Sequence, residues 1–271
     1  MIPDSKIESW LQEDIGHHDV TNQVPGETDG RLVAREPGVA AGLDGARAVF
    51  EYLGVDVETS VEPGDRIGPG DIVLRTGGPT RETLRGERVA VNVVGHASGI
   101  ATKTRRAVET ARETAESVRI ACTRKTTPGL RGIEKRAVVA GGGDTHRLNL
   151  SHMVMVKDNH VAEMGLESAI EHFRTKASFA TKIEVEVEEP EDAPRAAEAG
   201  ADIVLLDNMD PATTAHAVDR IRATDPDVLA EASGGISVED VPAYASTGVD
   251  IISMGSLTHS VETLDLSFRT G

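Results

Sequence analysis

The second half of the chain alternates short apolar runs with segments of helical periodicity. Strands this apolar are expected to be buried on both faces, as in a parallel sheet covered by helices. The six units favour a (β/α) barrel, complete or partly open, over a doubly wound sheet, and no G-x-G-x-x-G follows a first strand. The expected helices include 163–174, 191–198 and 211–223. The apolar runs are VRIAC (118–122), MVMV (153–156), IEVEV (183–187), DIVLL (202–206), VLAEA (228–232) and DIISMG (250–255).

The first 80 or so residues have a different pattern, which predicts a small α+β lobe. Asp4 or Ser5 is the expected cap of the first helix. A long helical segment over 83–117 follows the lobe, with a bend expected at Gly95 and Gly99. The other expected elements are helices at 4–14 and 42–53, a strand at 31–36 and two short strands within 61–78.

The composition is that of a globular protein with a large core. The chain has 271 residues, of which 39% are hydrophobic. Its first residues lack the basic and apolar regions of a signal peptide, and no apolar run reaches membrane-spanning length. Cys122 is the one cysteine, which excludes an intrachain disulfide and fits a reducing compartment. We therefore expect a cytoplasmic protein that binds no membrane.

The charge balance indicates a habitat and excludes one class of partner. The net charge is −17, and seven of the 28 basic residues are lysines. Many carboxylates, few lysines and 3% aromatic residues are typical of adaptation to a salty cytoplasm, where salt screens charge repulsion. No basic face of useful size remains for nucleic acid, so we expect no such partner.

One segment departs from this acidity. Residues 122–160 contain seven cations and three acids, so the segment carries +4 and the remainder −21. Three of these cations fit a solvated helix face: Arg131, Lys135 and Arg136. The other four lie in Gly-rich or apolar contexts and indicate an anion-binding site: Arg124, Lys125, Arg147 and Lys157.

These cations predict two anionic ligands. Arginine offers a bidentate fork for carboxylate or phosphate, and lysine a point charge. Arg124, Arg147 and Lys157 suit a small dianion, with His146 as a further donor. Lys125 is expected to face the opposite side or a loop that serves a second anion. The expected substrates are therefore a small polycarboxylate and a phosphorylated sugar.

Glycine turns follow the last two expected strands, at the end where barrel enzymes build their sites. Ser233-Gly234-Gly235 follows one run, and Gly255-Ser256 follows the next. Such glycines let backbone N–H groups approach a phosphate. A tight turn that needs glycine conformations is the alternative for either motif alone. Two such turns on neighbouring strands favour the phosphate site.

Three glutamates alternate along one expected strand and face the same side: Glu184, Glu186 and Glu188. Inward carboxylates are costly unless they meet cations, a metal or the open end of the barrel. Glu186 and Asp207, at adjacent strand ends, suit Mg²⁺ or the hydroxyls of a sugar. Glu184 suits either a functional role or a buried ion pair with a barrel lysine.

Taken together, these segments resemble the quinolinate phosphoribosyltransferase family. The resemblance runs from E-D-I-G at 13–16 nearly to the end of the chain, and T-R-K-T-T-P-G with K-D-N-H downstream is its most specific part. The matching motifs are E-R-V-A-V-N (87–92), H-A-S-G-I-A-T (96–102), T-R-K-T-T-P-G-L-R (123–131), G-G-G-D-T-H-R (141–147), V-K-D-N-H (156–160), E-V-E-V-E (184–188), L-L-D-N (205–208), S-G-G-I (233–236) and G-S-L-T-H (255–259).

The resemblance implies a fold, a reaction and an assembly. The fold would be an incomplete (β/α) barrel over 101–261, with an N-terminal α/β lobe over 1–100 that the tail 262–271 rejoins. The reaction would convert quinolinate and phosphoribosyl pyrophosphate into nicotinate mononucleotide, CO₂ and pyrophosphate, with Mg²⁺, in NAD biosynthesis. The assembly would be a homodimer or hexamer in which one subunit's lobe caps its partner's barrel.

The resemblance also implies the site residues. Lys125, Glu186 and Asp207 would be catalytic; the two acids would stabilise oxocarbenium character and hold Mg²⁺, and Lys125 would neutralise departing pyrophosphate. No general base is assigned, because the pyridinium nitrogen is the electron sink for decarboxylation. The residues expected to bind the pyridine dicarboxylate are Arg124, His146, Arg147, Lys157 and, from the partner subunit, Arg88. The residues expected around a phosphate are Ser233, Gly234, Gly235, Gly255 and His259.

The sequence departs from the family pattern at a few positions. His18 replaces a glycine expected in the N-terminal motif, and Asn149 and His152 depart beside the expected pyridine pocket. These last two make the preference among pyridine acids less secure than the reaction class. For His152, a surface or interface histidine is favoured over a catalytic one.

Three other functions remain open at this point. A related enzyme that uses nicotinate without decarboxylation is disfavoured, because three or four cations exceed the need of one carboxylate. A Schiff-base aldolase using Lys157 or Lys125 fits a barrel but not the clustered arginines. A non-catalytic phosphosugar-binding protein would retain binding when Glu186 and Asp207 are removed.

Overall fold

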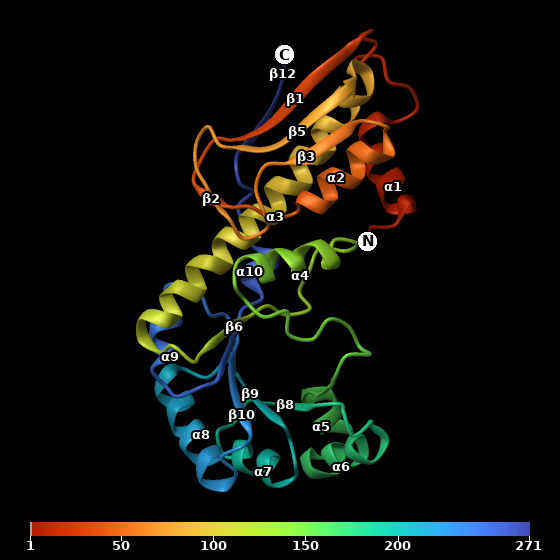
Figure 1. Ribbon diagram of the computed structural model, residues 1–271. Helices are drawn as coiled ribbons and strands as arrows, with labels where there is room; N and C mark the ends of the chain where they lie inside the picture. The colour runs from red at the N-terminus through yellow and green to blue at the C-terminus, as the bar shows by residue number, and fades with distance from the viewer. Residues whose placement is uncertain (1) are drawn as a thin grey trace. The chain divides into compact units, whose positions relative to one another are not determined.

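The computed structural model describes residues 2–271, which form two compact units (Figure 1). Unit 1 contains the described residues up to Arg105, together with Gly129–Gly142 and Val261–Gly271. Unit 2 contains Arg106–Pro128 and Gly143–Ser260. The sequence predicts a boundary after residue 100 with 129–142 in the barrel domain; in the structure this segment belongs to unit 1.

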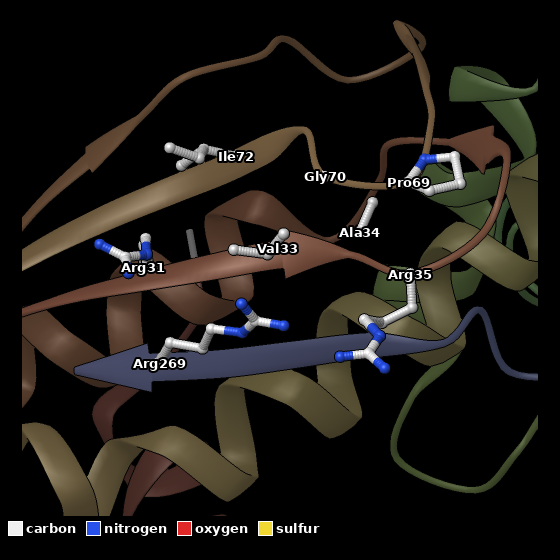
Figure 2. A pocket seen from close by; sticks show the side chains of 8 residues that line it. All are labelled: Arg31, Val33, Ala34, Arg35, Pro69, Gly70, Ile72 and Arg269. Carbon is white, nitrogen blue, oxygen red and sulfur yellow. The ribbon is translucent and has the colours of Figure 1, made fainter.

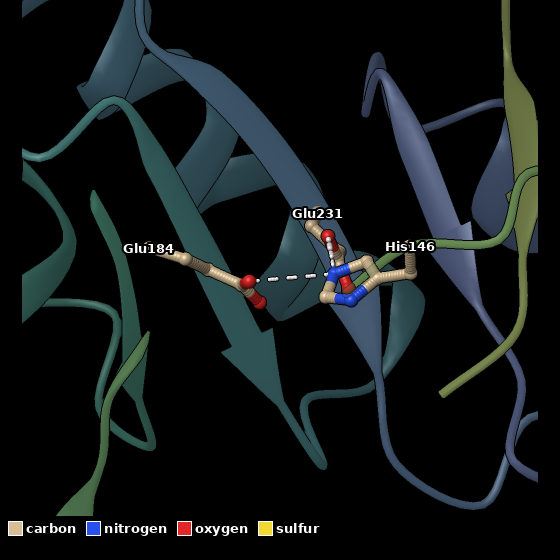
Figure 3. A group of neighbouring side chains, drawn as sticks. All are labelled: His146, Glu184 and Glu231. Carbon is tan, nitrogen blue, oxygen red and sulfur yellow. Dashed lines mark hydrogen bonds and ion pairs between the residues drawn. The ribbon is translucent and has the colours of Figure 1, made fainter. Parts of the chain in front are cut away.

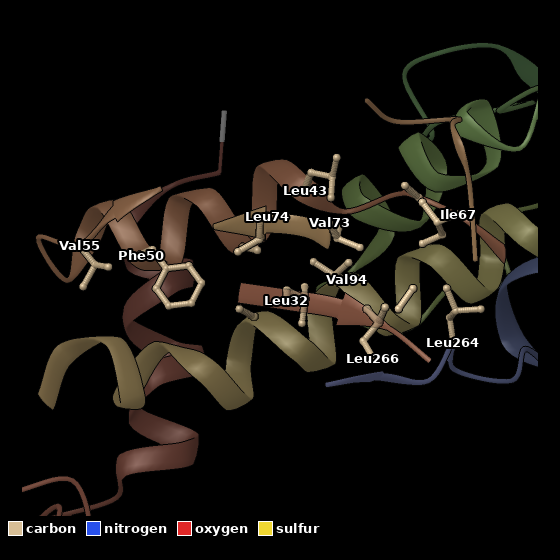
Figure 4. Packing of buried hydrophobic residues seen from close by; sticks show 14 residues of the cluster. Leu32, Leu43, Phe50, Val55, Ile67, Val73, Leu74, Val94, Leu264 and Leu266 are labelled. Carbon is tan, nitrogen blue, oxygen red and sulfur yellow. The ribbon is translucent and has the colours of Figure 1, made fainter. Parts of the chain in front are cut away.

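Unit 1 is built on an antiparallel sheet with strand order β12-β1-β5-β3. One face of the sheet packs against α2 and α3 through a core that includes Leu32, Phe50, Leu74 and Val94 (Figure 4). The expected α+β lobe therefore forms, with β2 and β3 as additional short strands. The elements are α1 (Asp4–Ile15), β1 (Glu27–Ala34), β2 (Gly38–Val39), α2 (Leu43–Tyr52), β3 (Asp56–Thr59), β4 (Arg66–Ile67), β5 (Ile72–Pro79), α3 (Thr80–Thr114), α4 (Arg131–Ala140) and β12 (Leu266–Thr270).

Helix α3 runs without interruption for 35 residues, through both Gly95 and Gly99. The two glycines admit the segment that precedes β12. A Cβ atom at Gly99 would lie 2.1 Å from the carbonyl oxygen of Glu262, and one at Gly95 would lie 2.8 Å from Thr263. The carbonyl of Gly95 also accepts a 3.0 Å hydrogen bond from the backbone of Leu264. Close packing of the two backbones requires glycine here.

Two local expectations in unit 1 also need correction. Helix α1 begins at Asp4 with Pro3 as its N-cap residue and no side-chain cap, so neither Asp4 nor Ser5 caps it. Lys135 is 3% exposed and does not belong to a solvated face, because α4 packs within unit 1. The Nε2 atom of His96 in α3 lies 2.9 Å from a carboxylate oxygen of the buried Glu134 in α4.

Unit 2 contains a six-stranded parallel sheet with strand order β6-β11-β10-β9-β8-β7. No pairing between the described residues of β6 and β7 closes the sheet, so the expected incomplete barrel is confirmed. Each expected strand forms, and the helices expected at 163–174, 191–198 and 211–223 correspond to α6, α7 and α8. The elements are β6 (Arg119–Ala121), β7 (Val154–Val156), α5 (Asp158–Met164), α6 (Leu166–Lys176), β8 (Ile183–Val187), α7 (Asp192–Glu198), β9 (Ile203–Asp207), α8 (Pro211–Thr224), β10 (Leu229–Ser233), α9 (Val241–Ala245), β11 (Ile251–Ser253) and α10 (Ser256–His259).

Parallel strands bring their carboxyl ends to one edge of a sheet, so the residues after β6 to β11 are gathered there. Among residues 2–271, no helix has both the length and the apolar character that crossing a membrane requires.

Candidate active site

A buried histidine lies between two buried glutamates inside unit 2 (Figure 3). The Nε2 atom of His146 is 3.3 Å from a carboxylate oxygen of Glu184 and 3.2 Å from one of Glu231. Both glutamates are fully buried, and the His146 side chain is 9% exposed. Glu184 therefore pairs with a histidine and not with the barrel lysine considered above.

The two glutamates beside His146 determine its protonation state. Burial alone would lower the pKa of His146, but the hydrogen bonds and charges of Glu184 and Glu231 outweigh it and raise that pKa to about 10. Burial raises the pKa of Glu184, and the charge of Glu231 acts in the same direction. His146 is thus an imidazolium at neutral pH, held inside the sheet by its two neighbours.

The segment before His146 explains how it reaches this position. Asp144 lies beside β6, where its backbone N–H donates to Ile120 and its carbonyl accepts from Cys122. The side chain of Asp144 then accepts a 2.7 Å hydrogen bond from the backbone of His146, whose φ of 51° is in the left-handed region. This turn directs His146 and the following Arg147 into unit 2.

Two arginines predicted to bind the substrate lie near one another. Arg147 is 7% exposed, and its guanidinium donates to the sulfur of Met155 on β7 at 3.1 Å. Burial lowers the pKa of Arg147, the positive charge of Arg124 lowers it further, and the charges of Glu184 and Glu186 oppose these two effects. A bound dianion would relieve this repulsion, because two guanidinium forks match two carboxylates.

Lys157 and Glu186 form an ion pair at the ends of β7 and β8. Lys157 is the N-cap residue of α5, and its backbone N–H donates to Nδ1 of His160 at 3.0 Å. Glu186 is 11% exposed in its side chain. Glu188, the third glutamate of the alternating run, lies past the end of β8 and is exposed.

The ends of β9 and β10 are in direct contact. Asp207 pairs in register with Ser233, and the side-chain amide of Asn208 donates to Asp207 at 2.6 Å. Gly234 has a φ of 97°, and a Cβ atom there would lie 2.6 Å from the backbone nitrogen of Asn208. Gly235 also has a positive φ, of 64°, with open space where its side chain would be. Glycine is required at both positions, and at Gly235 the backbone is accessible to a ligand.

Lys125, Gly255 and His259 are packed together between the loop after β6 and the helix α10. A Cβ atom at Gly255 would lie 3.0 Å from the Lys125 side chain and 3.2 Å from Nε2 of His259. The hydroxyl of Thr258 donates to the Lys125 carbonyl at 2.6 Å, which anchors the loop to α10. Lys125 and His259 are both exposed.

Arg88 lies on α3 within unit 1, with 59% of its side chain exposed. Its guanidinium is 3.9 Å from the carboxylate of the adjacent Glu87, which is a weak ion pair. The structure thus leaves the Arg88 side chain accessible to a partner.

The two residues that depart from the family pattern form local contacts in an exposed loop. The side chain of Asn149 accepts from the backbone of Ser151 at 2.9 Å, and Nδ1 of His152 accepts from the backbone of Leu148 at 3.2 Å. Their observed role is to hold this loop.

One cluster among the described residues has the donor set of a metal site, and it consists of His146, Glu184 and Glu231. Glu186 and Asp207, the residues predicted from the sequence to hold Mg²⁺, lie on adjacent strands but are not part of this cluster. Glu231 and Asp144 were not among the predicted site residues. A glutamate between alanines in a buried strand, A-E-A, is the signal that could have found Glu231.

Comparisons with known proteins agree over the whole chain. The family model for the quinolinate phosphoribosyl transferase C-terminal domain matches residues 100–269, and that for the N-terminal domain matches 19–98. A probable nicotinate-nucleotide pyrophosphorylase [carboxylating] of Methanothermobacter thermautotrophicus is 44% identical over 97% of each chain. The nicotinate-nucleotide pyrophosphorylase [carboxylating] of Homo sapiens is 41% identical, over 97% of this chain and 90% of its own. The crystal structure of nicotinate-nucleotide pyrophosphorylase from Ehrlichia chaffeensis is 32% identical with a TM-score of 0.92, and covers 100% of this chain and 99% of its own.

Proposed function

Because the chain belongs to the quinolinate phosphoribosyltransferase family, we propose that the residues at the carboxyl ends of the unit 2 strands are its active site. The reaction transfers the phosphoribosyl group of phosphoribosyl pyrophosphate to quinolinate and yields nicotinate mononucleotide, CO₂ and pyrophosphate, a step of NAD biosynthesis. The observation that carries the site assignment is the buried Arg147, which contacts Met155 of β7 and is repelled by the charge of Arg124, so that the two arginines suit a dicarboxylate.

In this proposal, quinolinate binds at the β6 and β7 ends of the sheet. Arg124 and Arg147 each take one carboxylate, and Lys157 adds a third positive charge beside them. His146 contributes its charge while its Nε2 stays with Glu184 and Glu231. A monocarboxylate such as nicotinate would leave one arginine of the pair unmatched.

Phosphoribosyl pyrophosphate binds beside it, over the ends of β8 to β11. Ser233, Gly234 and Gly235 offer backbone N–H groups to a phosphate, as does Gly255, with the side chains of His259 and Lys125 at the same turn. Two observations support this phosphate site: Lys125 and His259 pack closely around Gly255, and Gly234 and Gly235 have positive φ angles.

Mg²⁺ fits the acidic residues of this edge. Magnesium is usually bound by one or two carboxylates together with substrate phosphates and water. Glu186 and Asp207 supply one carboxylate each at adjacent strand ends, and each is partly exposed. Bound there, the ion would neutralise the charge of the pyrophosphate.

The chemistry needs little acid–base assistance. The anomeric C–O bond breaks, pyrophosphate leaves with the electron pair, and the quinolinate nitrogen forms the new bond to the same carbon. Glu186 and Asp207 stabilise the positive charge that develops on the sugar, and Lys125 stabilises the leaving oxygen. The carboxylate next to the nitrogen then leaves as CO₂, its electron pair remains on the ring carbon, and a proton from solvent replaces it.

The site includes a residue from a second copy of the chain. We place Arg88 of one subunit at the quinolinate site of another within a homodimer or hexamer, supported by its exposure on α3. Arg88→Ala alone should be inactive, and mixing it with inactive Lys125→Ala should restore part of the activity, because mixed dimers contain one intact site. Mixed subunits that exchange but stay inactive would remove the shared-site proposal.

An assay of the purified protein tests the reaction. With quinolinate, phosphoribosyl pyrophosphate and Mg²⁺, we expect nicotinate mononucleotide and CO₂ in equal amounts, and with nicotinate in place of quinolinate we expect neither. Absence of both products with quinolinate would sink the proposal. The ion pair between Lys157 and Glu186 disfavours a Schiff-base aldolase that uses Lys157, because a paired ammonium group is a poor nucleophile. The single, buried Cys122 supports a cytoplasmic location.

A further inference from the structure

A pocket on the sheet of unit 1 is lined by three arginines and no carboxylate (Figure 2). It has a volume of about 360 Å³ and lies along β1 and β12, next to the turn that precedes β5. Arg31 and Arg269 come from the two strands, and Arg35 follows the end of β1. The rest of its lining is apolar or backbone: Val33, Ala34, Pro69, Gly70 and Ile72.

The strand register places like charges side by side at this pocket. Arg31 is directly opposite Arg269 on β12 and opposite Arg75 on β5, so three arginines form a row across three strands, and Glu58 of β3 lies opposite Arg75 at the end of that row. Like charges directly opposite one another destabilise a sheet. Such a row costs stability in the ligand-free protein, and a bound anion would remove that cost.

The three pocket arginines differ from several other arginines of the chain in their ion pairing. Arg85, Arg195 and Arg222 are paired with carboxylates at 2.8 Å or less. No carboxylate lies within ion-pair distance of Arg35 or Arg269 among residues 2–271, and the guanidinium of Arg31 donates at 3.2 Å to an oxygen of Gly271, the last residue of the chain. In a chain of net charge −17, acids to neutralise them are abundant. Their position away from acids points to an anion from outside the chain.

We propose that this pocket binds a phosphorylated small molecule of about mononucleotide size. Guanidinium forks bind phosphate oxygens in pairs, so Arg31, Arg35 and Arg269 would hold the phosphate. The apolar floor formed by Val33, Pro69 and Ile72 would pack against a flat ring. The volume is at the lower end of the range found for small-molecule sites. All of these residues belong to unit 1, and none is assigned to the reaction above.

Adenosine monophosphate is a suitable probe, with adenosine and inorganic phosphate as its two halves. Calorimetric titration of the full-length protein, in an Arg124→Ala background and at one ionic strength, should detect adenosine monophosphate at one site per chain. We expect Arg31→Ala and Arg269→Ala each to weaken this binding about tenfold. Arg47→Ala, which removes an exposed arginine of α2 outside the pocket, should leave it unchanged. Phosphate should bind more weakly than the nucleotide, and adenosine should not bind detectably.

Three results would overturn the proposal. One is equal nucleotide binding by the wild type and both pocket variants, and another is phosphate binding as tightly as the nucleotide. The third is loss of self-association in Arg269→Ala with no nucleotide binding by the wild type, which would make this surface an interface between copies. Turnover of quinolinate should be unchanged in Arg31→Ala, so failure of the reaction assay would leave the pocket result intact.

Discussion

In unit 2 a histidine side chain is buried beside two carboxylates, whereas the arginines in one row on the unit 1 sheet lie beside like charges. His146 is held between Glu184 and Glu231, and each of the three is at most 9% exposed in its side chain. Arg31 lies between Arg75 and Arg269 on a surface that water reaches. Burial makes an unmatched charge costly, so the charge of His146 in unit 2 depends on the two glutamates beside it. Solvent and salt reduce that cost on the sheet, where an unmatched row can be kept for a ligand.

The largest expected effect concerns activity and separates the two regions. Arg147→Ala should lower kcat/KM for quinolinate by about 10² to 10³, because a buried cation facing a substrate carboxylate is lost. Arg269→Ala, which removes the same charge from unit 1, should retain the activity of the wild type. Steady-state kinetics of the two variants measure the difference. Similar kcat/KM values for the two variants would contradict the assignment of catalysis to the Arg147 region and not to the Arg269 region.

The next largest effect is the pH dependence of the free energy of unfolding, which we attribute to His146 in unit 2. His146 has a folded-state pKa raised to about 10 from 6.5, so its ion pairs stabilise the fold fully below pH 6.5 and are lost as the pH rises towards 10. The expected loss is on the order of a few kcal/mol in the free energy of unfolding. Urea unfolding at a series of pH values measures it. Glu231→Gln should flatten this dependence, and an equally steep curve in that variant would contradict the assignment to His146.

The smallest effect concerns the arginine row of unit 1. Arg269→Gln should raise the free energy of unfolding by a few tenths of a kcal/mol at low ionic strength, because it removes a like-charge neighbour of Arg31. The gain should vanish at high salt, where the repulsion is screened. Chemical unfolding at two salt concentrations checks both parts. Destabilisation at both salt concentrations would mean that favourable contacts stabilise Arg269. The claim that like charges destabilise the unit 1 sheet would then be wrong.

Local sequence patterns predict the strands of unit 2 well, because an apolar run such as 203–206 is buried whatever surrounds it. The open barrel and the motif residues follow from the order of those runs and from the family resemblance. The partner of Glu184 does not follow, because His146 reaches it from a loop 38 positions earlier in the chain. Gly95 and Gly99 show the same limit. A bend and a close approach both favour glycine in a helix, and the contact with 262–264 is set by tertiary packing.

Side-chain surroundings were the least predictable part of the site. Lys135 fits an exposed helix face by its spacing, yet α4 is packed on that side within unit 1. Glu231 is one acid in a buried strand, and its role depends on a histidine that the sequence places far away. By contrast, Lys125 and Gly255 were both identified from their motifs, and the structure packs them together.

Binding of the diacid tests the central claim most directly, because it isolates the pair of arginines from the later chemistry. Calorimetric titration of quinolinate and of nicotinate should be carried out with the wild type and with Arg147→Ala, in the absence of phosphoribosyl pyrophosphate. We expect the wild type to bind quinolinate at least tenfold more tightly than nicotinate, and we expect this preference to be lost in the variant. Equal affinity of the wild type for the two acids, or an unchanged preference in Arg147→Ala, would contradict it.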